Sequence, residues 1–192
     1  MRVSRIRAAL AIVLFSTVAA VVYGIVHDMV TAHVCLEYFT VAHPRLFATD
    51  IPAVHALAWG VIATWWMGAA LGVPLAIAAL AGRASPPMGW RDLLRPVAVL
   101  LAVAGGAALI AGVAGYILAE VDFFRMASVW ADQVPESRHS RFFFCAAAHM
   151  ASYTVAGAGG LMLVMWTWKE RQVRRWRAAA TAQTSSERTS SA

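Results

Sequence analysis

Charged residues are scarce in this chain of 192 residues. Asp, Glu, Lys and Arg together make up 14% of it, whereas hydrophobic residues make up 60%. A soluble domain usually contains about 25% charged and roughly 45–50% apolar residues. The mean hydropathy of +0.64 is high for the same reason. This composition excludes a disordered chain and argues against a soluble enzyme.

The sequence also lacks the short motifs that mark most catalytic sites. It has two cysteines, too few for a scaffold held together by disulfides, and they do not form a CxxC pair. It contains no HExxH, no paired ExxH, no phosphate-binding glycine loop and no nucleotide-binding motif. No acidic residue lies in the middle of an apolar stretch, which disfavours an oligomeric carrier or channel.

The sequence does contain four long apolar stretches, at about 8–26, 52–81, 97–119 and 142–168. Each has the roughly 20 apolar residues that a helix needs to cross a bilayer. The only His, Asp, Glu, Lys or Arg side chains inside them are His55 and His149. Backbone groups in a bilayer must be paired within their own segment, so each stretch is predicted to be helical. The sequence thus predicts an all-α polytopic membrane protein with a single four-helix domain over residues 1–177.

Basic residues are distributed unevenly between the two sides of these spans. The chain ends and the loop between the second and third spans hold twelve Lys and Arg residues, against four in the other two loops. The positive-inside rule therefore predicts cytoplasmic termini (N-in, C-in) in the inner membrane of a bacterium. The basic segments are expected to contact anionic lipid, so the net charge of +6 requires no nucleic-acid partner. The first span is longer than a signal-peptide core, which favours an uncleaved helix.

Small residues recur at helical spacing within the spans. Such residues let helix backbones approach closely in a membrane. Two interpretations stay open, a homodimer seam and packing inside the four-helix monomer, and the second is favoured. Pro74 is expected to bend the second span, because it removes one backbone hydrogen bond. The packing candidates are Gly68, Gly72, Ala108, Gly112 and Gly160.

Residues outside the spans are predicted to form two kinds of structure. From Val30 to Val41 apolar and polar residues alternate, which favours an extended segment lying across the outer helix ends as a cap. If this segment were helical, His33 and Glu37 would be neighbours at i,i+4. Residues 178–192 are rich in Ser, Thr and Ala without apolar periodicity, which predicts a disordered cytoplasmic tail.

One string after the first span resembles an uncharacterised family of bacterial multi-span membrane proteins. The string reads HDMVT…EYFTVAHP and is followed by ALAWGVIATWW. Members of that family carry an HDxxT…EYFT element at this place, and the resemblance extends over most of the chain. It implies no activity. It does imply a characteristic element made of His27, Asp28, Thr31, Glu37, Tyr38, Phe39 and Thr40.

Ionisable side chains gather towards the outer ends of the predicted helices. Histidine and carboxylate ligands together suit Zn, Fe or Mn, and ionisable groups near membrane depth are functional candidates. A bis-histidine haem between His55 and His149 is a further interpretation. Alternatively, the same residues serve as structural caps and interfacial anchors. The candidate polar cluster is His27, Asp28, Glu37, Tyr38, His55 and His149, and the candidate metal ligands are His27, Glu37, His55 and His149.

The two cysteines and the outer loops complete the predictions. Cys35 and Cys145 both fall on the outer side, where a disulfide would tie the loop to the bundle. The favoured function is a non-enzymatic accessory or scaffold subunit, with a protein partner or a second copy of the chain at its outer face. The alternative is a small membrane enzyme or redox protein with a His/carboxylate site that holds a metal or haem.

Overall fold

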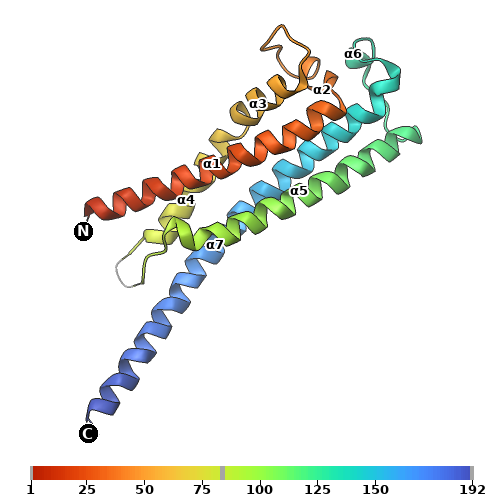
Figure 1. Ribbon diagram of the computed structural model, residues 1–192. Helices are drawn as coiled ribbons and strands as arrows, with labels where there is room; N and C mark the ends of the chain where they lie inside the picture. Colours follow the sequence, from red (N-terminus) through yellow and green to blue (C-terminus); the bar gives the residue numbers. More distant parts are fainter. Residues whose placement is uncertain (1, 83–84, 191–192) are drawn as a thin grey trace.

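The computed structural model describes residues 2–82 and 85–190, which form an elongated helical bundle without a strand (Figure 1). Four segments are long and apolar enough to cross a membrane, namely α1, the pair α3 and α4, α5, and part of α7. The predicted all-α class with four apolar spans is therefore confirmed. The elements are α1 (Arg2–Val34), α2 (Glu37–Thr40), α3 (Pro52–Ile62), α4 (Trp65–Leu80), α5 (Trp90–Glu120), α6 (Ser128–Ala131), η1 (Glu136–Arg138) and α7 (His139–Ser190).

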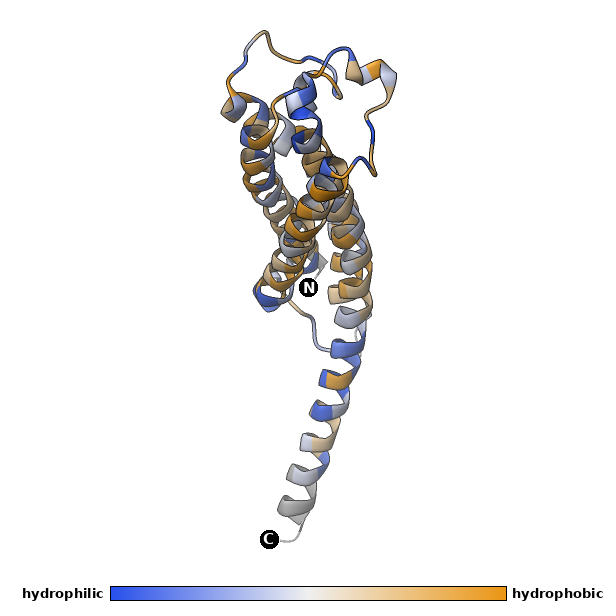
Figure 2. Ribbon diagram, turned by 90° about the vertical axis from the view of Figure 1, so that its right-hand side faces the viewer, coloured by the Kyte–Doolittle hydropathy of each residue, from blue (hydrophilic) through white to orange (hydrophobic). Residues whose placement is uncertain are grey.

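The bundle has two polar ends and an apolar middle (Figure 2). At one end, which we call the cap end, lie residues 35–51 and 121–138 with α2, α6 and η1. Arg138 and Glu37 form an ion pair there, at 3.8 Å, between the two loops. At the opposite end, Arg5 near the start of α1 donates to the carbonyl of Gly82 at 2.9 Å. The two loops with few basic residues, which the sequence placed on the same side of the spans, thus lie together at the cap end.

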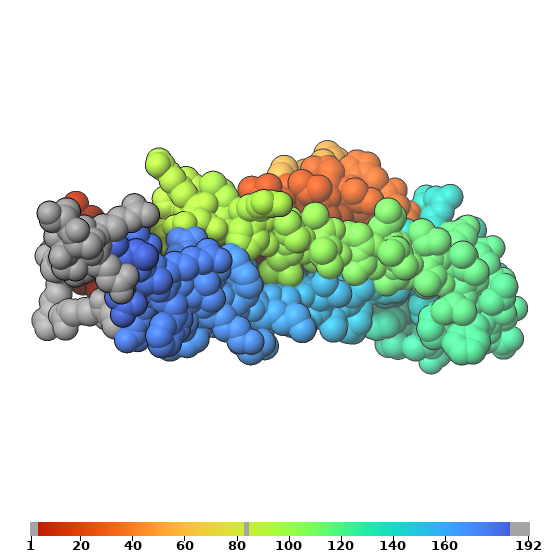
Figure 3. Space-filling view, turned by 90° about the horizontal axis from the view of Figure 1, so that it is seen from below, coloured from red at the N-terminus to blue at the C-terminus, as the bar shows by residue number. Residues whose placement is uncertain are grey.

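Small residues bring the helices into close contact within the chain. α1 packs on α3 and α4, and α5 lies along α7 (Figure 3). A methyl group at Gly68 would lie 2.7 Å from the Cα of Thr17, so only glycine allows α4 this close to α1. Ala108 is 3% exposed on α5. Gly72 similarly faces Val13, Gly112 faces Phe144 and Gly160 faces Leu71. The predicted packing positions are therefore used inside the monomer.

The second span is interrupted at Ala63 and Thr64, between α3 and α4, and Pro74 lies inside α4. The Thr64 amide bonds to Val61, three residues back, and its hydroxyl donates to the carbonyl of Gly60. Threonine hydroxyls that bond back to the preceding turn compete with the helical ladder and often bend a helix. The α-helical pattern resumes when the Gly68 amide bonds to Thr64.

The extended segment predicted over Val30–Val41 is wrong, because α1 continues to Val34 and α2 follows after a short turn. Val30 is 54% exposed and Ala32 is 1% exposed, although they would share a face on a strand. The pattern that decides the structure is helical. Asp28 is buried, and the other buried residues follow it at three, four and seven positions, which is helical spacing. They are Thr31, Ala32 and Cys35. Since the chain turns between Cys35 and Glu37, His33 and Glu37 do not share a helix either.

The disordered tail predicted at 178–192 is wrong for residues 178–190, which continue α7 as a helix; 191 and 192 lie outside the described residues. This stretch contains neither Gly nor Pro and begins with alanines, which have the highest helix propensity. Two threonine side chains also complete local bonds. Thr181 donates to the carbonyl of Arg177 at 3.0 Å and Thr184 to that of Ala180 at 2.8 Å.

Candidate metal centre

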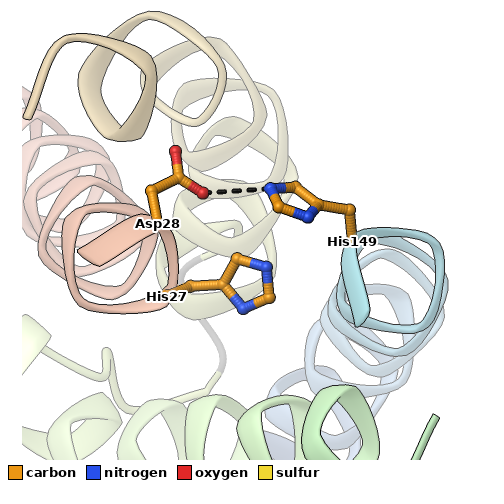
Figure 4. A group of neighbouring side chains, drawn as sticks. All are labelled: His27, Asp28 and His149. Atoms are coloured by element: carbon orange, nitrogen blue, oxygen red, sulfur yellow. Dashed lines mark hydrogen bonds and ion pairs between the residues drawn. The ribbon is translucent and has the colours of Figure 1, made fainter. Parts of the chain in front are cut away.

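Three ionisable side chains meet between α1 and α7 near the cap end. His27 and Asp28 come from α1 and His149 from α7, and all three point into the bundle (Figure 4). One potential ligand atom from each residue lies within 4.8 Å of the other two. Asp28 is 5% exposed and His149 8% exposed. We call these three residues the His–Asp cluster.

The two ring nitrogens of His149 both face hydrogen-bond acceptors. Nδ1 lies 2.8 Å from the backbone carbonyl of Cys145, which can only accept, so Nδ1 carries a hydrogen. Nε2 lies 3.1 Å from Oδ1 of Asp28. A neutral ring with its hydrogen on Nδ1 would present a lone pair to a carboxylate there. This contact therefore requires a second proton on His149, a proton on Asp28, or a cation bound by both atoms.

His27 completes the cluster from the other side. Its ring centroid lies 4.5 Å from that of His149, and the planes meet at 80°. Its Nε2 is buried and has no hydrogen-bond partner among the described residues. A buried polar atom without a partner is uncommon in folded proteins and costs stability. Two imidazoles and one carboxylate are a ligand set that suits Zn, Fe or Mn.

Local hydrogen bonds hold α1 in register with α7 at this site. The hydroxyl of Thr31 donates to the carbonyl of His27 at 3.1 Å, one turn back along α1. The thiol of Cys145 donates to the carbonyl of Thr31 at 3.3 Å, which joins α7 to α1. Because Cys145 also accepts from His149 through its carbonyl, the same residue positions the ring and the helix pair.

The short helix α2 covers the cluster from the cap end. The ring of Tyr38 lies 4.6 Å from that of His149, and the ring of Phe39 lies 5.7 Å from it. Phe39 is 1% exposed. Two aromatic rings therefore separate His149 from the cap loops and lower the local dielectric. The two halves of the HDxxT…EYFT element serve one site, because the first supplies polar groups and the second covers them.

Glu37 and the cysteines lie beside the cluster but outside it. Glu37 turns towards Arg138, and the thiol of Cys35 donates to its other oxygen at 3.3 Å. Burial and the nearby carboxylate raise the pKa of Cys35 to about 12. Cys35 and Cys145 share one apolar cluster, but both are free, so the predicted disulfide is not formed.

His55 is fully buried at another position. Its Nε2 lies 2.8 Å from the carbonyl of Thr49, in the loop before α3, and its ring faces Phe47. It is not part of the His–Asp cluster. Of the four candidate metal ligands named from the sequence, the structure thus brings together His27 and His149. Asp28, which the sequence indicated only as a polar candidate, is the third member.

A partly open cavity of about 90 Å³ extends from the cluster along the bundle axis. Its wall is mostly hydrocarbon, from leucines of α4, α5 and α7. Near the cluster it includes three hydroxyl side chains, Tyr23, Ser152 and Tyr153. The Tyr23 hydroxyl and the Ser152 hydroxyl lie 2.7 Å apart and bond to each other. The sequence showed no sign of this cavity, because its lining residues lie on all four spans.

Comparison of the chain with protein-family models, with curated proteins and with solved structures finds no match. The physical arrangement of the cluster and the cavity is therefore the basis for a function. That arrangement is a buried His–Asp cluster covered by aromatic rings, with an apolar cavity on its inner side.

Proposed function

We propose that this chain is an integral membrane protein that binds a divalent transition-metal ion at His27, Asp28 and His149. One observation carries the proposal. His149 presents Nε2 to the Asp28 carboxylate while Nδ1 donates to a carbonyl, and the buried Nε2 of His27 has no partner beside them. A metal ion satisfies all three groups, whereas one proton satisfies only the contact between His149 and Asp28.

The distances agree with ligands that share an ion. Metal–nitrogen and metal–oxygen bonds of about 2.0–2.2 Å place neighbouring ligand atoms about 3.0–3.5 Å apart. The Nε2 of His149 and Oδ1 of Asp28 are 3.1 Å apart. The ligand atom of His27 lies within 4.8 Å of both, and binding of an ion would draw it closer to them.

The membrane setting rests on composition and on the two ends of the bundle. The four apolar spans suit a bilayer, and the basic end with both chain termini suits the cytoplasmic side of a bacterial inner membrane. Anionic lipid would then contact the basic residues after the fourth span. The His–Asp cluster would lie in the outer half, beneath the cap end.

Three protein ligands leave further coordination positions open, as in catalytic metal sites. A bound ion would supply Lewis acidity or, if it is Fe or Mn, electron transfer. The residues of this chain hold the ion and shield it. Asp28 provides the negative charge, Cys145 orients His149, and Tyr38 with Phe39 excludes water from the cap side. We therefore infer a small metalloprotein of the enzyme or redox class in preference to an accessory subunit.

Metal analysis of the purified protein tests this proposal. The full chain is purified in mild detergent without added metal, and its metal content and absorption spectrum are measured. We expect near-stoichiometric Zn, Fe or Mn. Asp28→Ala and His149→Ala should each weaken metal binding by more than the 10–100-fold typical of losing a residue that only supports a ligand. Glu37→Gln is the matched control, since Glu37 is close in the fold but bonds elsewhere.

A different result would return the chain to a structural role. If the wild type contains no metal and takes up neither Zn²⁺ nor Mn²⁺ on dialysis, a proton on His149 or on Asp28 accounts for the contact between the two side chains. In that case Asp28→Ala and His149→Ala should each lower thermal stability, since both remove the contact, without any change in metal content. The accessory or scaffold function, with a partner at the cap end, would then be the better proposal.

A further inference from the structure

The cavity beside the His–Asp cluster combines a polar end with an apolar interior. Its polar end contains His27, Asp28 and His149 with the hydroxyls of Tyr23 and Tyr153. Beyond them, the wall consists mainly of the leucines Leu71, Leu75, Leu100, Leu101 and Leu163. Water gains few hydrogen bonds against such a wall, and apolar cavities in proteins take up apolar molecules. The cavity therefore favours a molecule with an oxygen at one end and hydrocarbon at the other.

The cavity shares its wall with a groove on the apolar surface of the bundle. This groove runs between α1 and α5, and Ala19, Tyr23, Val97 and Leu101 line both spaces. The outer side of the groove carries exposed apolar side chains such as Val22, which is 55% exposed. In a membrane this face borders lipid. A molecule dissolved in the bilayer would reach the cavity by displacing these four shared side chains, whereas from the cap end α2 covers the cluster.

We propose that the cavity binds a membrane-dissolved amphiphile, an alkyl or isoprenoid chain with an oxygen-bearing head, whose head meets the metal ion at the His–Asp cluster. This inference rests on the metal site proposed above and names the class of molecule that the site takes. At about 90 Å³ the cavity is smaller than the 150 Å³ apolar cavity that accommodates benzene. It admits the head and a short length of chain, so the rest of the chain lies in the groove between α1 and α5.

A matched pair of substitutions on α7 isolates the cavity. Ala156 lines it, and Ala158, two residues further on, is exposed on the outside of the bundle. Ala156→Leu adds the same side-chain volume as Ala158→Leu but places it inside the cavity. Leu101 lines both the cavity and the groove, and Leu101→Trp places a larger side chain between them. This is the second variant if Ala156→Leu fails to fold.

The experiment uses the full chain in lipid nanodiscs, loaded with Co²⁺ because its absorption bands report on its ligands. Decanoate is the amphiphilic probe, and acetate has the same head without the chain. We expect decanoate to change the Co²⁺ bands of the wild type and of Ala158→Leu at about tenfold lower concentration than those of Ala156→Leu, a difference of about 1.4 kcal/mol. Acetate should act equally on all three. Partitioning of decanoate into lipid is the same in each sample, so the ratio reports the cavity.

The outcomes separate this inference from the metal proposal. If all variants bind Co²⁺ and decanoate acts on them at equal concentrations, the cavity does not hold the chain and this inference is wrong, while the metal site stands. If the wild type binds no Co²⁺, the metal site fails and the inference fails with it. The inference is supported if Ala156→Leu needs about tenfold more decanoate than the wild type and Ala158→Leu do. The same increase in Leu101→Trp would also support it.

Discussion

Arg171 lies at the end of the bundle opposite the cap, and only 1% of its surface is exposed. Its guanidinium group donates to backbone carbonyls at the end of α4 and in the loop before α5. The last carbonyls of a helix have no partner within the helix, so an external donor stabilises them. Arg171 provides several such donors at once and links α7 to the loop before α5. The four carbonyls are those of Ala78, Ala81, Ser85 and Pro86, at 2.7–3.2 Å.

Replacing Arg171 with lysine should destabilise the protein markedly. The ammonium group is a compact donor on a flexible stem and cannot reproduce the planar fork, so some of the carbonyls lose their donor. Each unsatisfied buried group costs about 1–3 kcal/mol. Arg174→Lys is the matched control, because Arg174 forms ion pairs with Asp92 and Glu170 that are partly exposed and worth about 0–1 kcal/mol. Thermal unfolding in detergent should show a much lower midpoint for Arg171→Lys, and equal midpoints would contradict this role.

The sequence indicated the side chains of the candidate site better than their partners. His27 and His149 stood out because ionisable groups near an apolar span are rare. Their meeting depends on how α1 packs on α7, which no local pattern encodes. Arg171 was counted only as one of several cytoplasmic basic residues. Its role depends on carbonyls about 85–93 positions earlier in the chain, and no composition or spacing rule reveals them.

At the scale of elements, the contact between α1 and α3 depends on two glycines facing each other. A methyl group at Gly60 would lie 2.6 Å from the Cα of Ile25, and one at Gly24 would lie 2.6 Å from the carbonyl oxygen of Gly60. These neighbours are backbone atoms, so a side chain can be accommodated only if the helices move apart. The contact lies next to the helix interruption at Thr64, whose side chain also faces Gly24.

Gly60→Ala should therefore destabilise the bundle, although alanine is the better helix former by about 0.5–1 kcal/mol. Gly157→Ala on α7 is the control, since a methyl group there meets nothing within 4 Å. We expect Gly157→Ala to leave the thermal midpoint unchanged or raise it, and Gly60→Ala to lower it. If both substitutions raised the midpoint, the close approach of α1 and α3 would not be limited by this pair.

The apolar spans were predictable as elements because a bilayer-length hydrophobic run has few alternatives to a helix. Their ends were less predictable. The first run was placed at 8–26, but the helix continues to Val34, because hydropathy detects the apolar part and not the polar turns beyond it. Between Val30 and Val41 the sequence fits both the two-residue alternation of a strand and the repeat of a helix. The helix forms because it buries Thr31 and Cys35 on the same face as Asp28.

At the scale of the whole molecule, the two ends of the bundle make the proposed orientation testable. Asp50 lies exposed in the cap-end loop, and Ala178 is exposed on the part of α7 that extends beyond the bundle. In intact bacterial cells, a maleimide that cannot cross the membrane should label Asp50→Cys and leave Ala178→Cys unlabelled. After permeabilisation both should react. Labelling of Ala178→Cys in intact cells would reverse the proposed topology.

The same reagent should distinguish these introduced cysteines from the native Cys35 at the cap end. The thiolate is the reactive form, and burial with the nearby Glu37 carboxylate raises the pKa of Cys35 to about 12, so far less of it is ionised at pH 8 than of an exposed thiol. Cys35 is also fully buried. Native protein should therefore label slowly at pH 8, and unfolding in denaturant should remove this protection. Labelling of folded Cys35 at the rate of Asp50→Cys would mean that α2 opens readily, and the cover over the His–Asp cluster would then be a gate that exposes the site to the outer side.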